Sequence, residues 1–163
     1  MPGQLPISED LKELLRLFQF HHVEFVVVGA HAIAFYSRAR FTEDLDLFVK
    51  RSQDNAFRLK ASLEEFGFPM ADESARQLSE NPRAMIVLGA KPNQVDLLNF
   101  LDGVTFEDAW GRRKPGQMAD DLTVDFIALE DLVSSKKASN RPKDKYDLEL
   151  LKEFYRGNLP GGE

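Results

Sequence analysis

The chain has 163 residues, of which 43% are hydrophobic and 29% are charged, and it contains no cysteine. This composition is that of a globular domain and excludes general disorder. The missing cysteines exclude disulfides, thiol catalysis and cysteine-bound metals. The net charge of −6 disfavours a surface covered with basic residues for nucleic-acid binding. No apolar run approaches the roughly 20 residues of a membrane-spanning helix, and the first residues do not resemble a secretory signal, so we expect a cytoplasmic protein without a membrane partner.

The first 36 residues predict a helix, a buried strand and a short second helix. Ser8 is a typical helix N-cap and leucines follow it at helical spacing, so residues 8–20 should be helical. Residues 23–28 are mostly β-branched or aromatic and predict a buried strand. Gly29 ends this strand, and residues 30–36 predict a short helix.

The middle of the chain predicts a strand, a helix and a β-hairpin. Residues 45–49 favour a strand, and residues 53–66 favour a helix that Gly67 ends. Residues 69–82 are polar and irregular, so we expect an insertion without regular structure. The hairpin consists of strands over residues 84–88 and 94–100.

The last third predicts a helical turn, a strand and two helices, over residues 106–110, 122–128, 130–139 and 142–155. The order of the elements is typical of an α+β, or mixed α/β, domain with one central mixed sheet flanked by helices. We expect a single domain over residues 1–163. Its core would span about residues 20–128 and its C-terminal helix pair about residues 129–156.

Gly29 and Ala30 are the first candidate site residues, because they form a turn of small residues between a strand and a helix. Small side chains let a phosphate approach the backbone, and the helix N-terminus offers free N–H groups. An ordinary tight turn would explain the same two residues.

Asp44 and Asp46 are the second candidates. Side chains alternate along a strand, so the two carboxylates share one face while Leu45 and Leu47 point to the other. Two carboxylates at the mouth of a strand can bind Mg²⁺, which prefers hard oxygen ligands. A half-exposed strand with two solvated acids is the alternative.

Asp96 interrupts an apolar strand, where a buried carboxylate is costly unless it is paired or bound to a metal. If this strand lies beside that of Asp44 and Asp46, three carboxylates meet as they do in a two-metal phosphoryl-transfer site. If it is an edge strand instead, Asp96 lies in water.

The segment from Lys136 to Asp147 is the fourth candidate. Lys136, Arg141 and Lys143 could form a cationic wall for a triphosphate, with Asp144 and Asp147 on one helix face to orient the cations. Stabilising charges at the helix ends would explain the same residues. Weaker candidates, which solvated charge or a structural role explains as well, are Arg38, Arg40, His31 and the basic run 112–114.

Together, these features resemble the nucleotidyltransferase superfamily with the DNA polymerase beta-type fold. The resemblance rests on the strand and turn over 26–32, the acid-x-acid segment over 40–47, and Asp96. Residues 132–147 are similar to the K…R-x-x-D-x-x-D tail of small bacterial nucleotidyltransferases related to the abortive-infection toxins of toxin–antitoxin systems.

The resemblance implies an Mg²⁺-dependent transfer of a nucleotide from an NTP to an acceptor hydroxyl on an RNA end such as that of tRNA, on a protein or on a small molecule. It implies that Asp44, Asp46 and Asp96 are catalytic and hold two Mg²⁺ ions. An antitoxin would be the partner of a toxin of this kind. The residues implied in nucleotide binding are Gly29, Ala30, Arg40, Thr42, Lys136, Arg141 and Asp144.

Ala30 departs from the family pattern, in which Gly or Ser is usual at this position. A serine hydroxyl would bond a phosphate oxygen, and such a bond to a charged group contributes roughly 1.5–3 kcal/mol. The alternative function is therefore a non-catalytic nucleotide-binding or protein-interaction module of the same fold. The presence of all three aspartates favours the enzyme.

Overall fold

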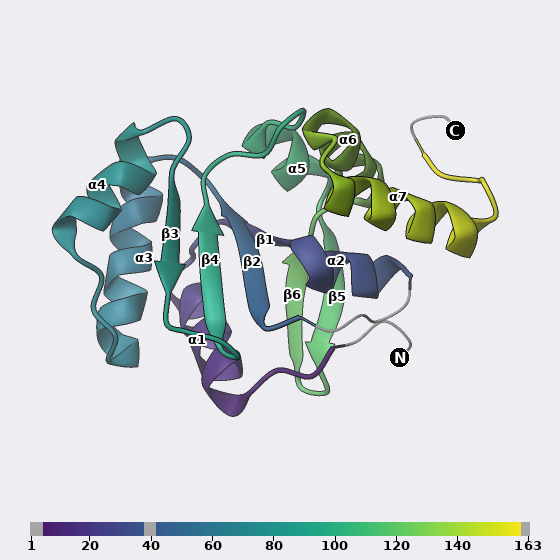
Figure 1. Ribbon diagram of the computed structural model, residues 1–163. Coiled ribbons are helices and arrows are strands. Elements are labelled where there is room, and N and C mark those ends of the chain that lie inside the picture. Colours follow the sequence, from purple (N-terminus) through teal and green to yellow (C-terminus); the bar gives the residue numbers. More distant parts are fainter. Residues whose placement is uncertain (1–4, 38–41, 161–163) are drawn as a thin grey trace.

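The computed structural model describes residues 5–37 and 42–160. The strands within these residues are β1 (Phe25–Val28), β2 (Asp44–Val49), β3 (Met85–Leu88), β4 (Gln94–Leu98), β5 (Lys114–Ala119) and β6 (Leu122–Phe126). The helices are α1 (Glu9–Phe20), α2 (Gly29–Tyr36), α3 (Gln53–Phe66), α4 (Asp72–Glu80), α5 (Phe106–Arg112), α6 (Leu129–Ser139) and α7 (Pro142–Tyr155). The strands form one mixed sheet in the order β3-β4-β2-β1-β6-β5 (Figure 1). This architecture confirms the predicted α+β, or mixed α/β, fold class.

The pairing of the three central strands positions the acidic residues. β1 pairs antiparallel with β2 and parallel with β6, and β2 runs parallel to β4. Val28, the last residue of β1, lies opposite Asp46, and Asp46 lies opposite Asp96. The carboxyl end of β1 therefore meets the first halves of β2 and β4 at the place where the chain enters α2.

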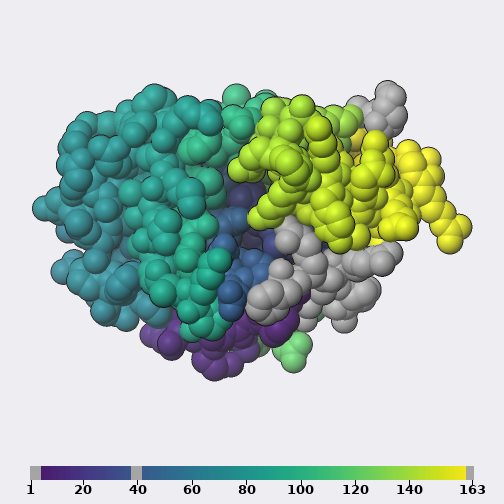
Figure 2. All heavy atoms as spheres, in the orientation of Figure 1, coloured from purple at the N-terminus to yellow at the C-terminus, as the bar shows by residue number. Residues whose placement is uncertain are grey.

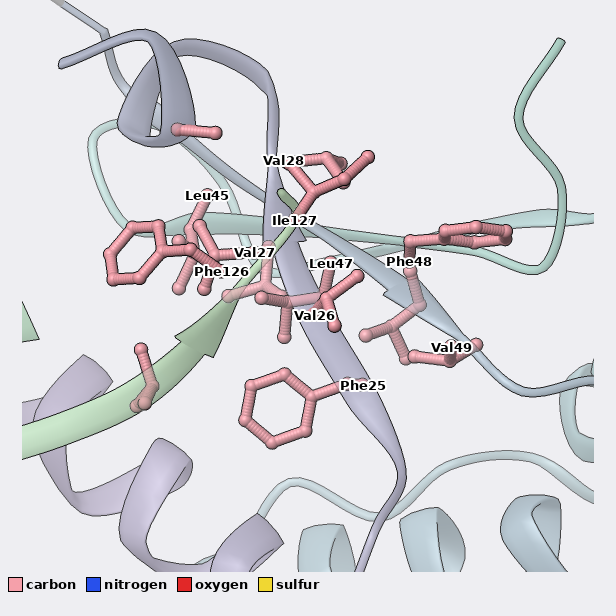
Figure 3. Close-up of a cluster of buried hydrophobic side chains, with 14 of the residues drawn as sticks. Phe25, Val26, Val27, Val28, Leu45, Leu47, Phe48, Val49, Phe126 and Ile127 are labelled. Atoms are coloured by element: carbon pink, nitrogen blue, oxygen red, sulfur yellow. The ribbon is translucent and has the colours of Figure 1, made fainter. Parts of the chain in front are cut away.

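The core is built from strands whose apolar side chains are covered by helices. β1 is buried along its whole length, and Leu45 and Leu47 of β2 are buried while the two aspartates of that strand are partly exposed. Figure 3 shows side chains of β1 and β2 packed together with Phe126 and Ile127 at the end of β6. The alternation expected for the acid-x-acid strand is thus present in the burial pattern.

The helices are placed on both sides of this sheet. α1 begins where the sequence predicts, because Ser8 Oγ accepts a hydrogen bond from the backbone N–H of Leu11 at 3.2 Å. α1 packs against α3, whereas α6 packs against α7, which also contacts α2. In Figure 1, α1 and α3 lie behind the sheet and α2 lies in front of it, next to the predicted C-terminal helix pair. Among the described residues, no helix is both long and apolar enough to span a membrane.

The prediction of an irregular insertion over residues 69–82 is wrong, because α4 occupies residues 72–80 of this segment. α4 is mostly polar and buries only Leu78. Arg76 stabilises it through ion pairs with Glu73 at 2.6 Å and Glu80 at 3.2 Å, one turn away on either side. Ala75 and Leu78 are the only apolar residues of α4 and lie one turn apart on the side that packs on the core, which is too few for the sequence pattern to predict the helix.

The strand β5 was also not predicted from the sequence. It pairs antiparallel with β6 at the edge of the sheet. Pro115 and Gly116 disfavour a strand, but proline is tolerated on an edge strand, where it need not donate to a neighbour. Gly116 packs against Phe35 and Phe126, and a Cβ at this position would lie only 2.8 Å from Phe126 Cδ1.

The remaining elements agree with the prediction apart from their ends. The predicted hairpin is formed by β3 and β4, which pair antiparallel, although β4 ends at Leu98 and not at residue 100. α2 begins at Gly29 itself, one residue earlier than expected.

Candidate active site

Asp46 and Asp96 form a carboxyl pair in the middle of the sheet. Their strands are parallel neighbours with these two residues in register, and the two carboxyl groups are close enough for each to affect the protonation of the other. Gln94 Nε2 donates a hydrogen bond to Asp96 Oδ1 at 2.9 Å. Asp96 is buried, and its strand β4 lies between β2 and β3. The alternative of an edge-strand aspartate in water is therefore excluded.

The surroundings of Asp46 favour its protonated form. Burial, followed by the negative charge of Asp96 and the hydrogen bond between the two groups, raises the pKa of Asp46 to about 7. The positive charge of Lys143 acts in the opposite direction. The pair therefore retains a proton at pH values at which an ordinary aspartate has lost it.

Asp44 lies near the pair but is not part of it. Its Oδ1 atom is buried and has no hydrogen-bond partner among residues 5–37 and 42–160. Among the residues that the structure describes, no group of three His, Asp or Glu side chains is arranged to hold a metal ion. The donor set nevertheless fits Mg²⁺, since a proton-sharing carboxyl pair and an unpartnered carboxylate oxygen are hard ligands that a cation would stabilise.

The turn between β1 and α2 lies directly against Asp46. Gly29 has a φ of +71°, and a Cβ at this position would overlap the Asp46 carboxylate, with Cγ only 2.9 Å away. Only glycine allows this close approach of the backbone to the acid. Ala30 is buried and does not line the pocket beside Asp46.

A pocket of about 110 Å³ joins the acidic strand to the C-terminal helices. Gly29 and Asp46 line one side of it, and Lys136, Arg141 and Lys143 line the other. The space-filling view in Figure 2 shows a hollow between the teal and yellow-green parts of the molecule, with blue atoms at its floor. Four of the predicted nucleotide-binding residues line the pocket, namely Gly29, Lys136, Arg141 and Asp144.

Asp144 binds two of the cations, as the sequence predicts. Lys136 Nζ lies 3.3 Å from Asp144 Oδ1, and Arg141 donates to Asp144 Oδ2 from its Nε at 3.0 Å and from its backbone N–H at 3.1 Å. Burial alone would raise the pKa of Asp144, but the hydrogen bonds from Arg141 and the charge of Lys136 lower it below its ordinary value. Asp147, which the sequence places on the same helix face, lies 3.0 Å from Lys136 Nζ, so it belongs to this cluster as well.

Like Ala30, the predicted residue Thr42 does not line this pocket. The hydroxyl of Thr42 bonds both the backbone N–H and the carbonyl of Asp44, each at 3.2 Å, and so holds the start of β2.

Thr42 and Asp44 line a second cavity of about 260 Å³ together with His31. Burial lowers the pKa of His31 to about 4, so its ring is neutral. Arg40, like Arg38, lies outside the described residues.

The two arginines of the basic run over residues 112–114 are engaged in internal ion pairs. The Arg112 guanidinium binds Asp131 through contacts of 2.8 and 3.1 Å. Arg113 binds Asp125 at 3.1 Å and stacks on Trp110. These arginines are held away from the pocket, and the interpretation of the run as a phosphate-binding loop is not supported.

Comparison with known families identifies the family of the chain. The model of a family described as nucleotidyl transferase of unknown function (DUF2204) matches residues 7–159. The chain belongs to this family. The matched segment runs from the residue before the α1 cap to beyond α7, and so contains the acidic strands and the cationic cluster. The predicted resemblance to nucleotidyltransferases is thereby confirmed, and no curated protein matches the chain in a sequence search.

Proposed function

We propose that the protein is an Mg²⁺-dependent nucleotidyltransferase that transfers the nucleotide of an NTP to an acceptor hydroxyl. The observation that carries this proposal is Asp46, which is paired with Asp96, lies against the Gly29 turn and lines a pocket with three cations. Acids that bind a divalent ion and cations that bind phosphate are the two requirements of phosphoryl transfer.

Each group has a role in this reaction. Asp46 and Asp96, with Asp44 beside them, would hold Mg²⁺, which when bound neutralises charge on the triphosphate and favours ionisation of the acceptor hydroxyl. The backbone at Gly29 allows a phosphate to approach, and the wall from Lys136 to Lys143 attracts the negative charge. The acceptor oxygen forms a bond to the α-phosphorus, the bond to the β-phosphate oxygen breaks, and pyrophosphate leaves. The hydroxyl proton passes to a carboxylate or to water.

The acceptor belongs to one of three classes: an RNA end such as that of tRNA, a protein, or a small molecule. If the enzyme is the toxin of a toxin–antitoxin pair, an antitoxin is its partner. Incubation with each NTP labelled at the α-phosphate, together with each acceptor class, identifies the acceptor by the molecule that becomes labelled.

The first test is thermal melting with each of the four NTPs, with and without Mg²⁺. A ligand that binds only the native state raises the melting temperature by mass action. We expect a shift that requires both NTP and Mg²⁺ and that disappears in the Asp44→Asn/Asp46→Asn double variant. A wild-type protein that shows no shift with any NTP at millimolar concentration would remove the support for a nucleotide site.

A non-catalytic module is the second candidate function, and Ala30 favours it. The turn lacks the hydroxyl with which a serine would bond a phosphate oxygen. Measurement of pyrophosphate release distinguishes the two functions. Mg²⁺-dependent NTP binding without pyrophosphate release, in the presence of all three acceptor classes, would identify the module.

A further inference from the structure

The three cations of the pocket differ in how they are bound. Lys136 is buried and contacts both Asp144 and Asp147, at 3.3 and 3.0 Å, and these two side chains are 1% and 0% exposed. Arg141 binds Asp144 through its side chain and its backbone. Two cations and two carboxylates thus form a neutral cluster between α6 and α7.

Lys136 cannot easily leave this cluster for a ligand. Its departure would leave two buried carboxylates without one of their cations, which is strongly unfavourable in a low-dielectric interior. The positive charge of Lys136 is also largely cancelled, since a phosphate approaching it would meet Asp144 and Asp147 as well. The contacts of Lys136 are those of a residue that holds α7 against α6.

Lys143 has the opposite surroundings. It is exposed, lies one residue before Asp144 and lines the pocket with Gly29 and Asp46. Within the described part of the chain, no hydrogen bond or ion pair holds its ammonium group. Its positive charge nevertheless acts on Asp46, where it partly offsets the burial that raises the pKa of that carboxyl group.

The position of Lys143 in its helix does not favour stability. It lies in the first turn of α7, and the positive end of the helix dipole disfavours a cation in that turn. Stabilising helix-end charges, the alternative explanation of this segment, therefore account for Asp144 but not for Lys143. An unpaired cation at an unfavourable helix end, which lines a pocket together with Asp46, is suited to an anionic ligand.

We propose that Lys143, and not Lys136, is the residue that binds the triphosphate in this pocket, and that Lys136 serves to neutralise Asp144 and Asp147. This inference rests on the proposed function, because it assigns the polyphosphate-binding residue of the same site. The ligand class is a nucleoside triphosphate, of which the polyphosphate chain is the part that Lys143 contacts.

The test compares Lys143→Gln with Lys145→Gln, a matched control two residues further along α7 that is exposed and outside the pocket. Calorimetric titration measures the affinity of each variant for the four NTPs with Mg²⁺ and for inorganic tripolyphosphate. We expect Lys143→Gln to melt no lower than the wild type and to lose about tenfold or more in affinity for both kinds of ligand. Lys145→Gln should bind as the wild type does.

The third variant is Lys136→Gln, whose ligand affinity is measured below its own melting temperature. We expect it to melt at a clearly lower temperature than the wild type and, while folded, to lose less affinity for tripolyphosphate than Lys143→Gln. Unchanged affinity in Lys143→Gln, or a larger loss in folded Lys136→Gln, would overturn the inference. If Lys136→Gln does not fold, the comparison of Lys143→Gln with Lys145→Gln decides alone.

The outcomes separate this inference from the proposed function. Tripolyphosphate binding that depends on Lys143, without nucleotide transfer to any acceptor, supports the inference and contradicts the transferase. Transfer that is unaffected by Lys143→Gln supports the transferase and contradicts the inference. A wild-type protein that binds neither NTP nor tripolyphosphate overturns both.

Discussion

Asp46 and Asp96 lie opposite each other on two parallel strands, and their closeness favours a proton on Asp46. Because burial and the neighbouring carboxylate raise the pKa of Asp46 from 3.8 to about 7, the native state binds this proton more tightly than the unfolded state does. The stabilisation of the native state by this proton is complete below about pH 4 and is lost as the pH rises to about 7. The ligand-free protein should therefore become less stable across this range, by at most about 4 kcal/mol from this group.

Asp46→Asn tests the pH dependence. An asparagine amide can donate to Asp96 at every pH, so the variant should be more stable than the wild type at pH 8 and should lose this part of the pH dependence. Urea unfolding of both proteins at pH 5 and pH 8, without divalent ions, measures the effect. Equal pH dependence in the two proteins would show that the pair does not retain its proton.

Gly29→Ala should both destabilise the protein and weaken its binding of Mg²⁺ and NTP. The new Cβ would overlap the Asp46 carboxylate, and the φ of +71° adds strain. Gly67→Ala is the matched control, because Gly67 also has a positive φ, of +96°, but a Cβ added there would meet no atom within 4 Å. We expect a loss of about 1–2 kcal/mol for the control, from the backbone alone, and a larger loss for Gly29→Ala. Equal losses in denaturant unfolding would contradict the close packing of the turn on Asp46.

Asp147→Asn should destabilise the protein by about 3 kcal/mol, because it removes one charge from a buried ion cluster. Glu149→Gln in the same helix removes an exposed carboxylate that lies 3.6 Å from Lys152, and its effect should stay below about 1 kcal/mol. Thermal unfolding of both variants gives the comparison. Similar effects of the two substitutions would mean that the cluster does not stabilise the packing of α7 on α6.

Leu78→Ala tests the helix that the sequence did not predict. Leu78 is the buried residue of α4 and is 1% exposed, so its truncation should cost about 2–4 kcal/mol in urea unfolding. A cost below about 0.5 kcal/mol, the usual effect of a surface substitution, would show that α4 is not packed on the rest of the protein.

The parts of the fold that could be predicted are those with a local signal. The run over residues 23–28 and the alternation around Asp44 and Asp46 follow from side-chain periodicity. In α4 and β5 such a signal is weak, since α4 buries only Leu78 and β5 is held by its pairing with β6.

The residues of the candidate site were likewise predictable only where the signal is local. The sequence indicates that Asp96 is an unusual residue in its strand, but its register opposite Asp46 depends on the pairing of distant segments. The different surroundings of Lys136 and Lys143 likewise depend on how α6 packs on α7. Spacing places both lysines in one basic segment and cannot show which of them the aspartates bind.

The junction between β1 and α2 determines where the chain can change its length. β1 is hydrogen-bonded to a strand on each side, and α2 begins at the residue that directly follows it. An inserted residue at this junction has no loop to absorb it, so it would move Gly29 off Asp46 or shift the strand register. The link over residues 89–93 joins two strands at the protein surface, and insertions there extend only an exposed turn. Length variation among relatives of this chain should therefore accumulate in that link and spare the junction.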